Sequence, residues 1–372
     1  MPATARPIRV GVIVNNVGGY SRGVIRGITS FAYARAWTCR VQGVNDESID
    51  KRLDEFDGLI VQTATPQQSK AMAALNIAIV NVSSKLELQQ FPSVVSDDVA
   101  VGRLGADHFL QRGHHRLVYF APEDRQYARL RHAGFHQRVR ETRNATEERV
   151  TTERELTRVI EQREDRLAIM ACNDRAALVV LERCRAMKVR VPDEVAVLGV
   201  DNDDLVQSLA YPPMSTINTA RERIGFEAAS MLERLISGQA LPARSVLIPP
   251  QSVIVRRSTD VLALDDTEVA DAVRYIHAHA GRPIGVNDVL REVPLSRRQL
   301  ERRFRIALGR SILDEISRCR IERAKQLLVD TELTLPQVAL ASGFRSASYF
   351  SVVFGKLAGT TPGSFRGQLP HS

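Results

Sequence analysis

Residues 294–305 read PLSRRQLERRFR, and this stretch decides how the last quarter of the chain folds. Ser296 and Gln299 match a capping box, in which a hydroxyl and an amide side chain satisfy the free N–H groups at a helix start. Leu300 and Phe304 lie four residues apart, as on the buried face of a helix, and Arg298, Glu301, Arg302 and Arg305 fall on the opposite face. The stretch therefore predicts an amphipathic helix with an apolar back and an arginine-rich front.

The same arrangement recurs near the C-terminus. A short helix is expected over 335–342, a turn at 343–344, and a second helix over 346–357. The buried face of the second helix is expected to consist of Tyr349, Phe350, Val353 and Phe354. Gly343 suits the left-handed position that ends a helix. Between the two units, 312–328 predicts one long helix with Ile316, Ile321, Ala324 and Leu328 on its apolar side. Each unit is a candidate helix-turn-helix, and the long helix would hold the two apart.

The positive charge of the protein is concentrated in this helical region. The 372 residues carry a formal charge of +8, of which residues 281–372 contribute +7 through 15 Lys and Arg against 8 Asp and Glu. A basic module on a nearly neutral body indicates a polyanionic partner, most often nucleic acid. An arginine-fronted helix fits the major groove, where Arg can donate two hydrogen bonds to guanine. Charge and periodicity alone also fit an arginine-rich solvated surface on an ordinary helical bundle.

The preceding part of the chain alternates strand and helix patterns. Strands are predicted over 8–14, 59–61, 77–82, 117–120, 168–171 and 195–200, with late strands over 246–250 and 253–255; helices are predicted near 21–34, 100–112, 129–142, 174–187 and 220–237. This alternation predicts doubly wound parallel sheets. The domains are expected at 1–257 and 268–368, with a linker over 258–267, where the pattern weakens.

Several classes of protein are disfavoured by the sequence. No signal peptide and no membrane-spanning run is recognised, so a cytoplasmic protein is expected. The four cysteines have no Cys-x-x-Cys spacing, and no histidine spacing is interpreted as a metal site, so no metal and no cofactor are predicted. No nucleophile–base pair or dinucleotide-binding turn is recognised, and Gly18-Gly19 is not followed by the Gly-Lys-Ser/Thr of a phosphate loop. We expect no enzyme; the alternative is an exported or cytoplasmic sugar-binding protein, or an enzyme, on the same α/β fold.

The helical region resembles the AraC family of transcription activators. The resemblance is carried by 294–304, 320–325, 338–344, 348–350 and 361–366. It implies a double helix-turn-helix in which Arg298, Glu301 and Arg302 read bases. With their neighbours, the expected DNA-binding residues are Arg297, Arg298, Glu301, Arg302, Arg305, Arg345, Ala347, Ser348, Ser351 and Val352. Val352 departs from the pattern, since many relatives have arginine there, so the first helix is expected to dominate sequence discrimination.

The α/β part resembles the two-lobed sensor of LacI-type repressors and periplasmic sugar-binding proteins, and most closely the XylR branch of the AraC family. The resemblance is carried by 20–23, 26–28, Trp37, 56–60, 96–102, 131–135, 170–174 and 198–203. It implies a sugar effector, D-xylose or another monosaccharide, bound between the lobes. It also implies double-stranded DNA as partner, a homodimer, and RNA polymerase contact if the protein is an activator.

Candidate sugar ligands follow from position as well as from this resemblance. Asn173 and Asp174 end one predicted strand and Asp201 ends another, and ligands of such folds bind at the carboxyl ends of strands. The resemblance marks Arg131 and Asp201 first, followed by Asn173, Asp174, Tyr127, Asp97 and Arg22. An Asp or Asn after a strand also caps the following helix in many proteins, so that interpretation stays open.

One segment departs from the relatives. Only about two dozen strongly charged residues separate the helix that ends near Arg143 from the strand at Ala168. Relatives have a strand and a helix there, so a trimmed second lobe is expected.

Overall fold

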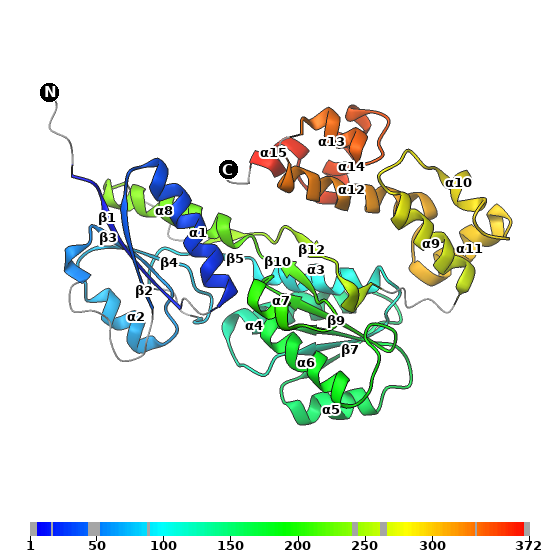
Figure 1. The fold of residues 1–372 in the computed structure, drawn as a ribbon, viewed down its shortest axis with the longest axis horizontal. Helices are drawn as coiled ribbons and strands as arrows, with labels where there is room; N and C mark the ends of the chain where they lie inside the picture. The colour runs from blue at the N-terminus through cyan, green and yellow to red at the C-terminus, as the bar shows by residue number, and fades with distance from the viewer. Residues whose placement is uncertain are drawn as a thin grey trace. The chain divides into compact units, whose positions relative to one another are not determined.

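The computed structural model describes residues 6–15, 18–43, 53–87, 90–239, 245–260, 266–331 and 333–367. Contacts divide the chain into an α/β unit, residues 1–106 and 116–260, and a helical unit, residues 107–115 and 261–372. Figure 1 shows the strands in the blue to yellow-green part of the chain and helices alone from yellow to red. The predicted fold class is confirmed.

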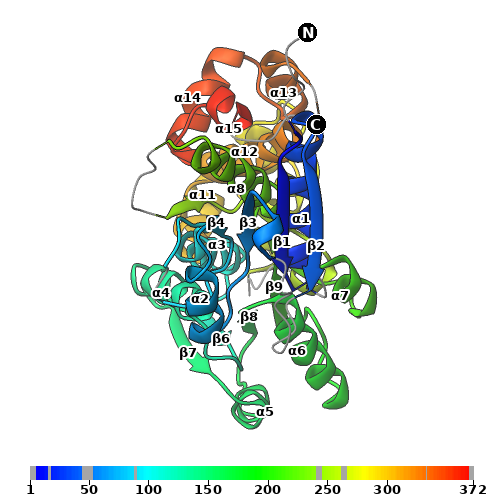
Figure 2. The same ribbon diagram turned by 90° about the vertical axis from the view of Figure 1, so that its left-hand side faces the viewer.

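The first lobe of the α/β unit is a parallel sheet with the strand order β2-β1-β3-β4. Its strands are β1 (Arg9–Val14), β2 (Thr38–Gly43), β3 (Gly58–Val61) and β4 (Ala78–Asn81), and its helices are α1 (Gly19–Ala34), α2 (Pro66–Ala73) and α8 (Arg221–Ile236). Because helices cover both faces, β1 and β3 are almost continuous apolar runs. Helices α1 and α8 lie side by side (Figures 1 and 2) and share one apolar core with the sheet.

The second lobe is a six-stranded sheet with the order β12-β10-β9-β8-β6-β7, in which only β12 is antiparallel to its neighbour. Its strands are β6 (Arg116–Phe120), β7 (Thr146–Val150), β8 (Leu167–Ala171), β9 (Val195–Val200), β10 (Ser215–Asn218) and β12 (Ser252–Ile254). Its helices are α3 (Asp98–Leu110), α4 (Gln126–Arg140), α5 (Glu153–Glu161), α6 (Asp174–Ala186) and α7 (Asp204–Leu209).

The chain crosses between the lobes three times. Strand β5 (Val94–Ser96) leads into α3, β10 leads back into α8, and β11 (Val246–Ile248), which pairs with β5, leads into β12. These crossings bring the carboxyl ends of strands from both sheets to one cleft. The predicted strands and helices of this unit are present, with ends that differ by at most three residues.

The expectation of a trimmed second lobe is wrong. The charged segment after Arg143 contains both β7 and α5. Strand β7 lies at the edge of the sheet, where Thr146, Glu148 and Arg149 reach solvent, so it lacks the apolar run of a central strand. Helix α5 begins with a capping box between Thr152 and Glu155, and it buries Leu156, Val159 and Ile160 at helical spacing. Its start signal was therefore present in the sequence.

The predicted linker is structured at both of its described ends. Residues Arg257–Thr259 form a 3-10 turn, and the Ser258 hydroxyl donates to the carbonyl of Val197 at 2.6 Å, which attaches the turn to the α/β unit. Asp266 caps the first helix of the helical unit. Residues 261–265, the middle of the predicted linker, lie outside the described residues.

The helical unit consists of two small cores joined by one long helix. The helices are α9 (Thr267–His279), α10 (Val286–Leu290), α11 (Arg297–Leu308), α12 (Ile312–Asp330), α13 (Leu335–Ala341), α14 (Ala347–Ala358) and α15 (Pro362–Gly367). Helix α12 contributes Ile312 and Ile316 to the core under α9–α11, and Ile321, Ala324 and Leu328 to the core under α13–α15. The predicted spacer helix is confirmed, and it ties the two helix-turn-helix units together.

Candidate functional site

A cavity of about 220 Å³ lies between the two lobes of the α/β unit. It is lined by polar residues that follow strands: Asn15, Gln62 and Ser83 in the first lobe, and Glu123, Asn173 and Asp201 in the second. The volume lies below the ~300–1,000 Å³ typical of pockets for drug-sized ligands. A small ligand with many hydroxyl groups matches this size and this lining.

Arg131 is the central cation of the cavity. Its Nε lies 2.8 Å from Oδ1 of Asp98, its Nη1 donates to the carbonyl of Cys172 at 2.5 Å, and its Nη2 lies 3.4 Å from Oδ1 of Asp201. Burial opposes the charged guanidinium, but the carboxylates of Asp98 and Asp201 raise the pKa of Arg131 above its usual value. Arg131 is thus a fixed, permanently charged donor at the cavity wall.

Two glycines allow Arg131 to reach Asp98. A Cβ on Gly102 of α3 would lie 1.8 Å from the carbonyl oxygen of Arg131, and a Cβ on Gly134 of α4 would lie 2.0 Å from that of Val99. The two helices therefore pack backbone against backbone at this point. This close approach places the guanidinium beside the carboxylate.

Asp201 occupies a strained position where β9 ends. Its φ is 101° and that of Asn202 is 49°. Residues other than glycine rarely adopt a positive φ. Its carboxylate also accepts from the hydroxyl of Thr219 at 3.4 Å. Strain of this kind is concentrated at functional sites, where the surrounding structure holds the residue in place.

Asn173 and Asp174 have structural partners as well as cavity positions. The Asn173 side chain caps α6 by accepting from the N–H of Ala176, and its amide donates to the Tyr127 hydroxyl at 3.1 Å. The buried carboxylate of Asp174 accepts from the N–H of Asp203 at 2.7 Å and from the hydroxyl of Thr216 at 2.6 Å. Burial raises the pKa of Asp174 to about 7.

Two predicted ligand residues do not line the cavity. Asp97 caps the start of α3, where Oδ1 accepts from the N–H of Ala100 at 3.0 Å. Arg22 forms an ion pair with Asp203. Since Oδ2 of Asp203 also accepts from the N–H of Gly19 at 2.7 Å, this carboxylate connects the first lobe to the second.

The prediction missed several cavity residues. Tyr20, Gln62, Ser83, Ser84, Lys85, Glu123 and Arg175 line the cavity, and Asp98 holds Arg131. Gln62 and Ser83 follow β3 and β4, so the rule that selected Asn173 and Asp201 was available for them too. Asp98 is the residue that follows the predicted Asp97. The two differ in the direction in which their side chains point at the start of α3, and the sequence does not show this direction.

In the helical unit, α11 has the predicted two-sided character. Ser296 and Gln299 form the capping box, and Leu300 and Phe304 are buried. The exposed side carries Arg297, Arg298, Glu301, Arg302 and Arg305. Nε of Arg297 lies 2.9 Å from the Glu301 carboxylate, and this contact orients the first arginine along the helix surface.

Helix α14 begins at its cap, Ser346, and buries Phe350 and Phe354. Its exposed residues include Ser348, Ser351 and Val352, while Ala347 is half-buried and Arg345 is exposed just before the helix. Tyr349 was expected in the buried face, but it is 53% exposed. It follows Ser348 on the outer side of the first turn, which adds an aromatic ring to the exposed surface.

Gly343 fixes the turn between α13 and α14. Its φ is +78°, and a Cβ there would lie 2.5 Å from the carbonyl oxygens of Ala280 and Arg282. Both the left-handed backbone and the close contact require glycine, as the sequence predicted.

Comparisons with known proteins agree with this geometry. Residues 106–259 match the periplasmic binding protein-like domain, and residues 289–368 match a helix-turn-helix domain. The xylose operon regulatory protein of Escherichia coli (strain K12) is 29% identical over 96% of each chain, and that of Haemophilus influenzae is 26% identical over 98% of this chain and 99% of its own. A solved structure of the xylose-binding transcription activator XylR covers 99% of this chain and 100% of its own, with 26% identity and a TM-score of 0.63.

The chain is thus similar over nearly its whole length to XylR-type transcription regulators.

The relatives that match nearly the whole chain are named as transcription regulators and not as enzymes. The α/β unit also shares the fold of a CelR–cellobiose complex, with 21% identity and a TM-score of 0.57 over 67% of this chain and 84% of the other. Among the described residues, every helix is too short or too polar to span a membrane.

The interpretation of the histidines missed one spacing. His132 and His136 lie four residues apart on α4, and both imidazoles face Glu147 of β7. The prediction of no metal site therefore passed over a recognisable pair of metal-ligand residues.

Proposed function

We propose that this regulator binds a monosaccharide of the xylose type between its lobes, and that the bound sugar controls how α11 and α14 hold operator DNA. The identity of the sugar is supported by the relatives, which are named xylose operon regulatory proteins. The small cavity with its many hydrogen-bonding groups supports a monosaccharide.

The observation that carries the sugar site is the pair Arg131 and Asp201 at the cavity wall. A guanidinium donates to neighbouring sugar hydroxyls in a fixed fork, and a carboxylate accepts from them. Asn173 adds an amide. The ring of Tyr127 offers an aromatic surface for the apolar face of a sugar. The centroid of this ring lies 5.0 Å from the guanidinium carbon of Arg131. Asp174 acts mainly by holding Asp203 and Thr216, and Arg22 acts through its ion pair with Asp203.

For DNA, we propose that Arg298, Glu301 and Arg302 read base edges in the major groove, with Arg297 and Arg305 beside them. Arg345, Ala347, Ser348, Ser351 and Val352 would contact a second groove segment. The support is the exposed arginine side of α11, directly opposite a buried Leu300 and Phe304. A helix with this division fits a groove and packs on its own domain at once.

The remaining features of the proposal rest on the relatives. We propose that the protein is a cytoplasmic homodimer that activates transcription through RNA polymerase, since the solved structure is named a transcription activator. The sugar acts by favouring one arrangement of the protein over another, so it must bind that arrangement more tightly.

The test uses the full chain and a labelled DNA fragment from its own operon promoter. Fluorescence anisotropy should show salt-sensitive DNA binding that changes when D-xylose is added, and less with D-ribose or L-arabinose. Asp201→Asn should abolish the sugar response and leave DNA binding without sugar intact. DNA binding that no pentose alters would contradict the proposed effector, and absence of salt-sensitive DNA binding would contradict the regulator.

A further inference from the structure

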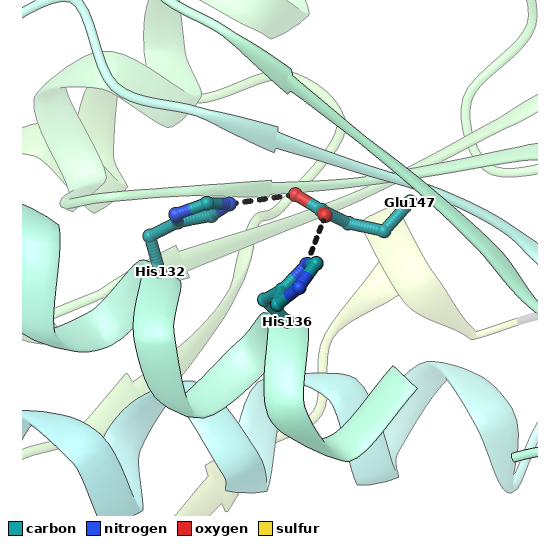
Figure 3. A group of neighbouring side chains, drawn as sticks. All are labelled: His132, His136 and Glu147. Atoms are coloured by element: carbon teal, nitrogen blue, oxygen red, sulfur yellow. Dashed lines mark hydrogen bonds and ion pairs between the residues drawn. The ribbon is translucent and has the colours of Figure 1, made fainter. Parts of the chain in front are cut away.

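A cluster of three side chains outside the effector cavity has the composition of a metal site. His132 and His136 lie on consecutive turns of α4, and Glu147 lies on the edge strand β7. Nε2 of His132 lies 2.8 Å from one carboxylate oxygen of Glu147, and Nδ1 of His136 lies 2.8 Å from the other. Figure 3 shows both rings directed at the carboxylate.

We propose that His132, His136 and Glu147 bind a divalent ion of the zinc class. Two imidazole nitrogens and one carboxylate oxygen form a ligand set that Zn²⁺ accepts, with a fourth position left for water. Mg²⁺ and Ca²⁺ prefer oxygen ligands alone, so the two imidazoles select against them.

The positions of the ligand atoms fit a single ion. They all lie within 4.8 Å of one another. Ligands at about 2.0–2.1 Å from a tetrahedral Zn²⁺ lie about 3.3 Å apart. The present contacts of 2.8 Å would therefore lengthen by about 0.5 Å, which small rotations of the three side chains supply.

The surroundings favour binding by holding the ligands in place and leaving a path for the ion. The Glu147 side chain is 7% exposed, that of His132 is 21% exposed and that of His136 is 46% exposed, so the cluster opens to solvent on the His136 side. The ring of the buried Tyr119 lies 5.2 Å from that of His132, centroid to centroid, and packs beside it. Residues four apart on a helix share one face, so α4 presents both rings to β7 together.

A second group with metal-ligand side chains is less suitable. His277, Glu315 and Cys319 also bring their ligand atoms together. However, the carboxylate of Glu315 already pairs with Arg310 at 2.5 Å and with Arg318 at 2.6 Å. An ion there would displace or approach two guanidinium groups, whereas both oxygens of Glu147 face imidazoles.

The site has a mechanical consequence for the second lobe. A bound ion would join α4 to β7, and a ligand that binds the folded state alone stabilises it. Helix α4 also carries Tyr127 and Arg131 at the effector cavity. Binding of the ion can be measured in the absence of both a sugar and DNA.

The experiment uses the full chain without a histidine tag, dialysed against a chelator and then against metal-free buffer. Calorimetric titration with Zn²⁺ should show one ion per chain, and Zn²⁺ should raise the melting temperature. Co²⁺ should give a visible spectrum of nitrogen and oxygen ligation without a thiolate band. His136→Gln, at an exposed position, and Glu147→Gln should each weaken Zn²⁺ binding by at least ~tenfold, since even residues behind the ligands contribute 10–100-fold.

Two controls complete the test. His115→Gln removes an exposed histidine outside the cluster and should leave Zn²⁺ binding unchanged, as should Cys319→Ser. The proposal is overturned if Zn²⁺ does not bind, if Mg²⁺ stabilises the protein equally, or if both cluster variants bind as tightly as the unaltered chain. If Glu147→Gln does not fold, the His136→Gln titration decides alone.

Discussion

Nε of Arg131 lies 2.8 Å from Oδ1 of Asp98, and the two side chains are 4% and 0% exposed. The pair joins α3 to α4 at the wall of the cavity between the lobes, and the remaining guanidinium nitrogens face Cys172 and Asp201. A buried charge is tolerated only while its partner is present, because water is not there to replace it. Asp98 is thus a positioning residue for the predicted sugar contact Arg131.

Asp98→Ala should destabilise the α/β unit by about 3–5 kcal/mol, since it leaves the buried guanidinium without its nearest carboxylate. The adjacent Asp97→Ala removes only a helix cap, for which about 0.5–2 kcal/mol is expected. Calorimetric unfolding of the full chain measures the loss of stability in each variant. Equal losses for these neighbouring residues would contradict the different roles assigned to them.

Gly102→Ala should weaken both stability and sugar binding. The added methyl group would lie 1.8 Å from the Arg131 carbonyl oxygen, so α3 and α4 must move apart, at a cost of about 1–3 kcal/mol or more. Gly355→Ala in α14 is the matched control, because its Cβ meets no atom within 4 Å.

The control should stabilise the helical unit by about 0.5–1 kcal/mol through the loss of backbone freedom in the unfolded chain. Thermal unfolding and sugar titration are measured for both variants. A Gly102→Ala protein with unaltered sugar affinity would show that the close helix approach does not position Arg131.

Asp174 should make stability depend on pH. Burial raises its pKa from 3.8 to about 7, so the folded state holds a proton that the unfolded state releases. The stabilisation from this protonated carboxyl is complete below about pH 4, and it falls by at most ~1.4 kcal/mol per pH unit as pH rises through 7. Asp174→Asn has no such proton.

The stability of the unaltered protein relative to Asp174→Asn should therefore decrease between pH 4 and 7 and level off above it. Melting temperatures of both proteins across this range give the comparison, in which other titrating groups cancel. A difference that stays constant with pH would mean that Asp174 is ionised throughout.

Arg302→Ala should weaken binding to the operator by about 1–3 kcal/mol and relax the base preference at one position. Its binding to random DNA should change much less, because phosphate contacts from the other arginines remain. Arg274→Ala is the control, since Arg274 is an exposed arginine of α9 paired with Asp271. Anisotropy titrations with operator and random duplexes distinguish base reading from phosphate contact. Equal losses of affinity on both duplexes would rule out base reading by Arg302.

The elements that could be predicted are those marked by residues close together in the sequence, such as apolar runs and helix caps. Buried parallel strands such as β9 are continuous apolar runs, and the start of α11 carries its cap at Ser296. Strand β7 was missed because an edge strand needs no apolar run, although the Thr152–Glu155 box marked the helix after it. Tyr349 was misplaced because helical periodicity identifies an apolar face but not its limits, and an aromatic residue at the margin can point outward.

By itself, the sequence determined the two domain types, the parallel α/β pattern and the arginine side of α11, because each of these arises from residues close together in the chain. The tertiary structure alone decided that Asp98 rather than Asp97 meets Arg131, and that Glu147 joins His132 and His136. Those contacts depend on how helices and strands pack, and a shift of one residue along α3 turns the side chain by about 100°, as 3.6 residues per turn require.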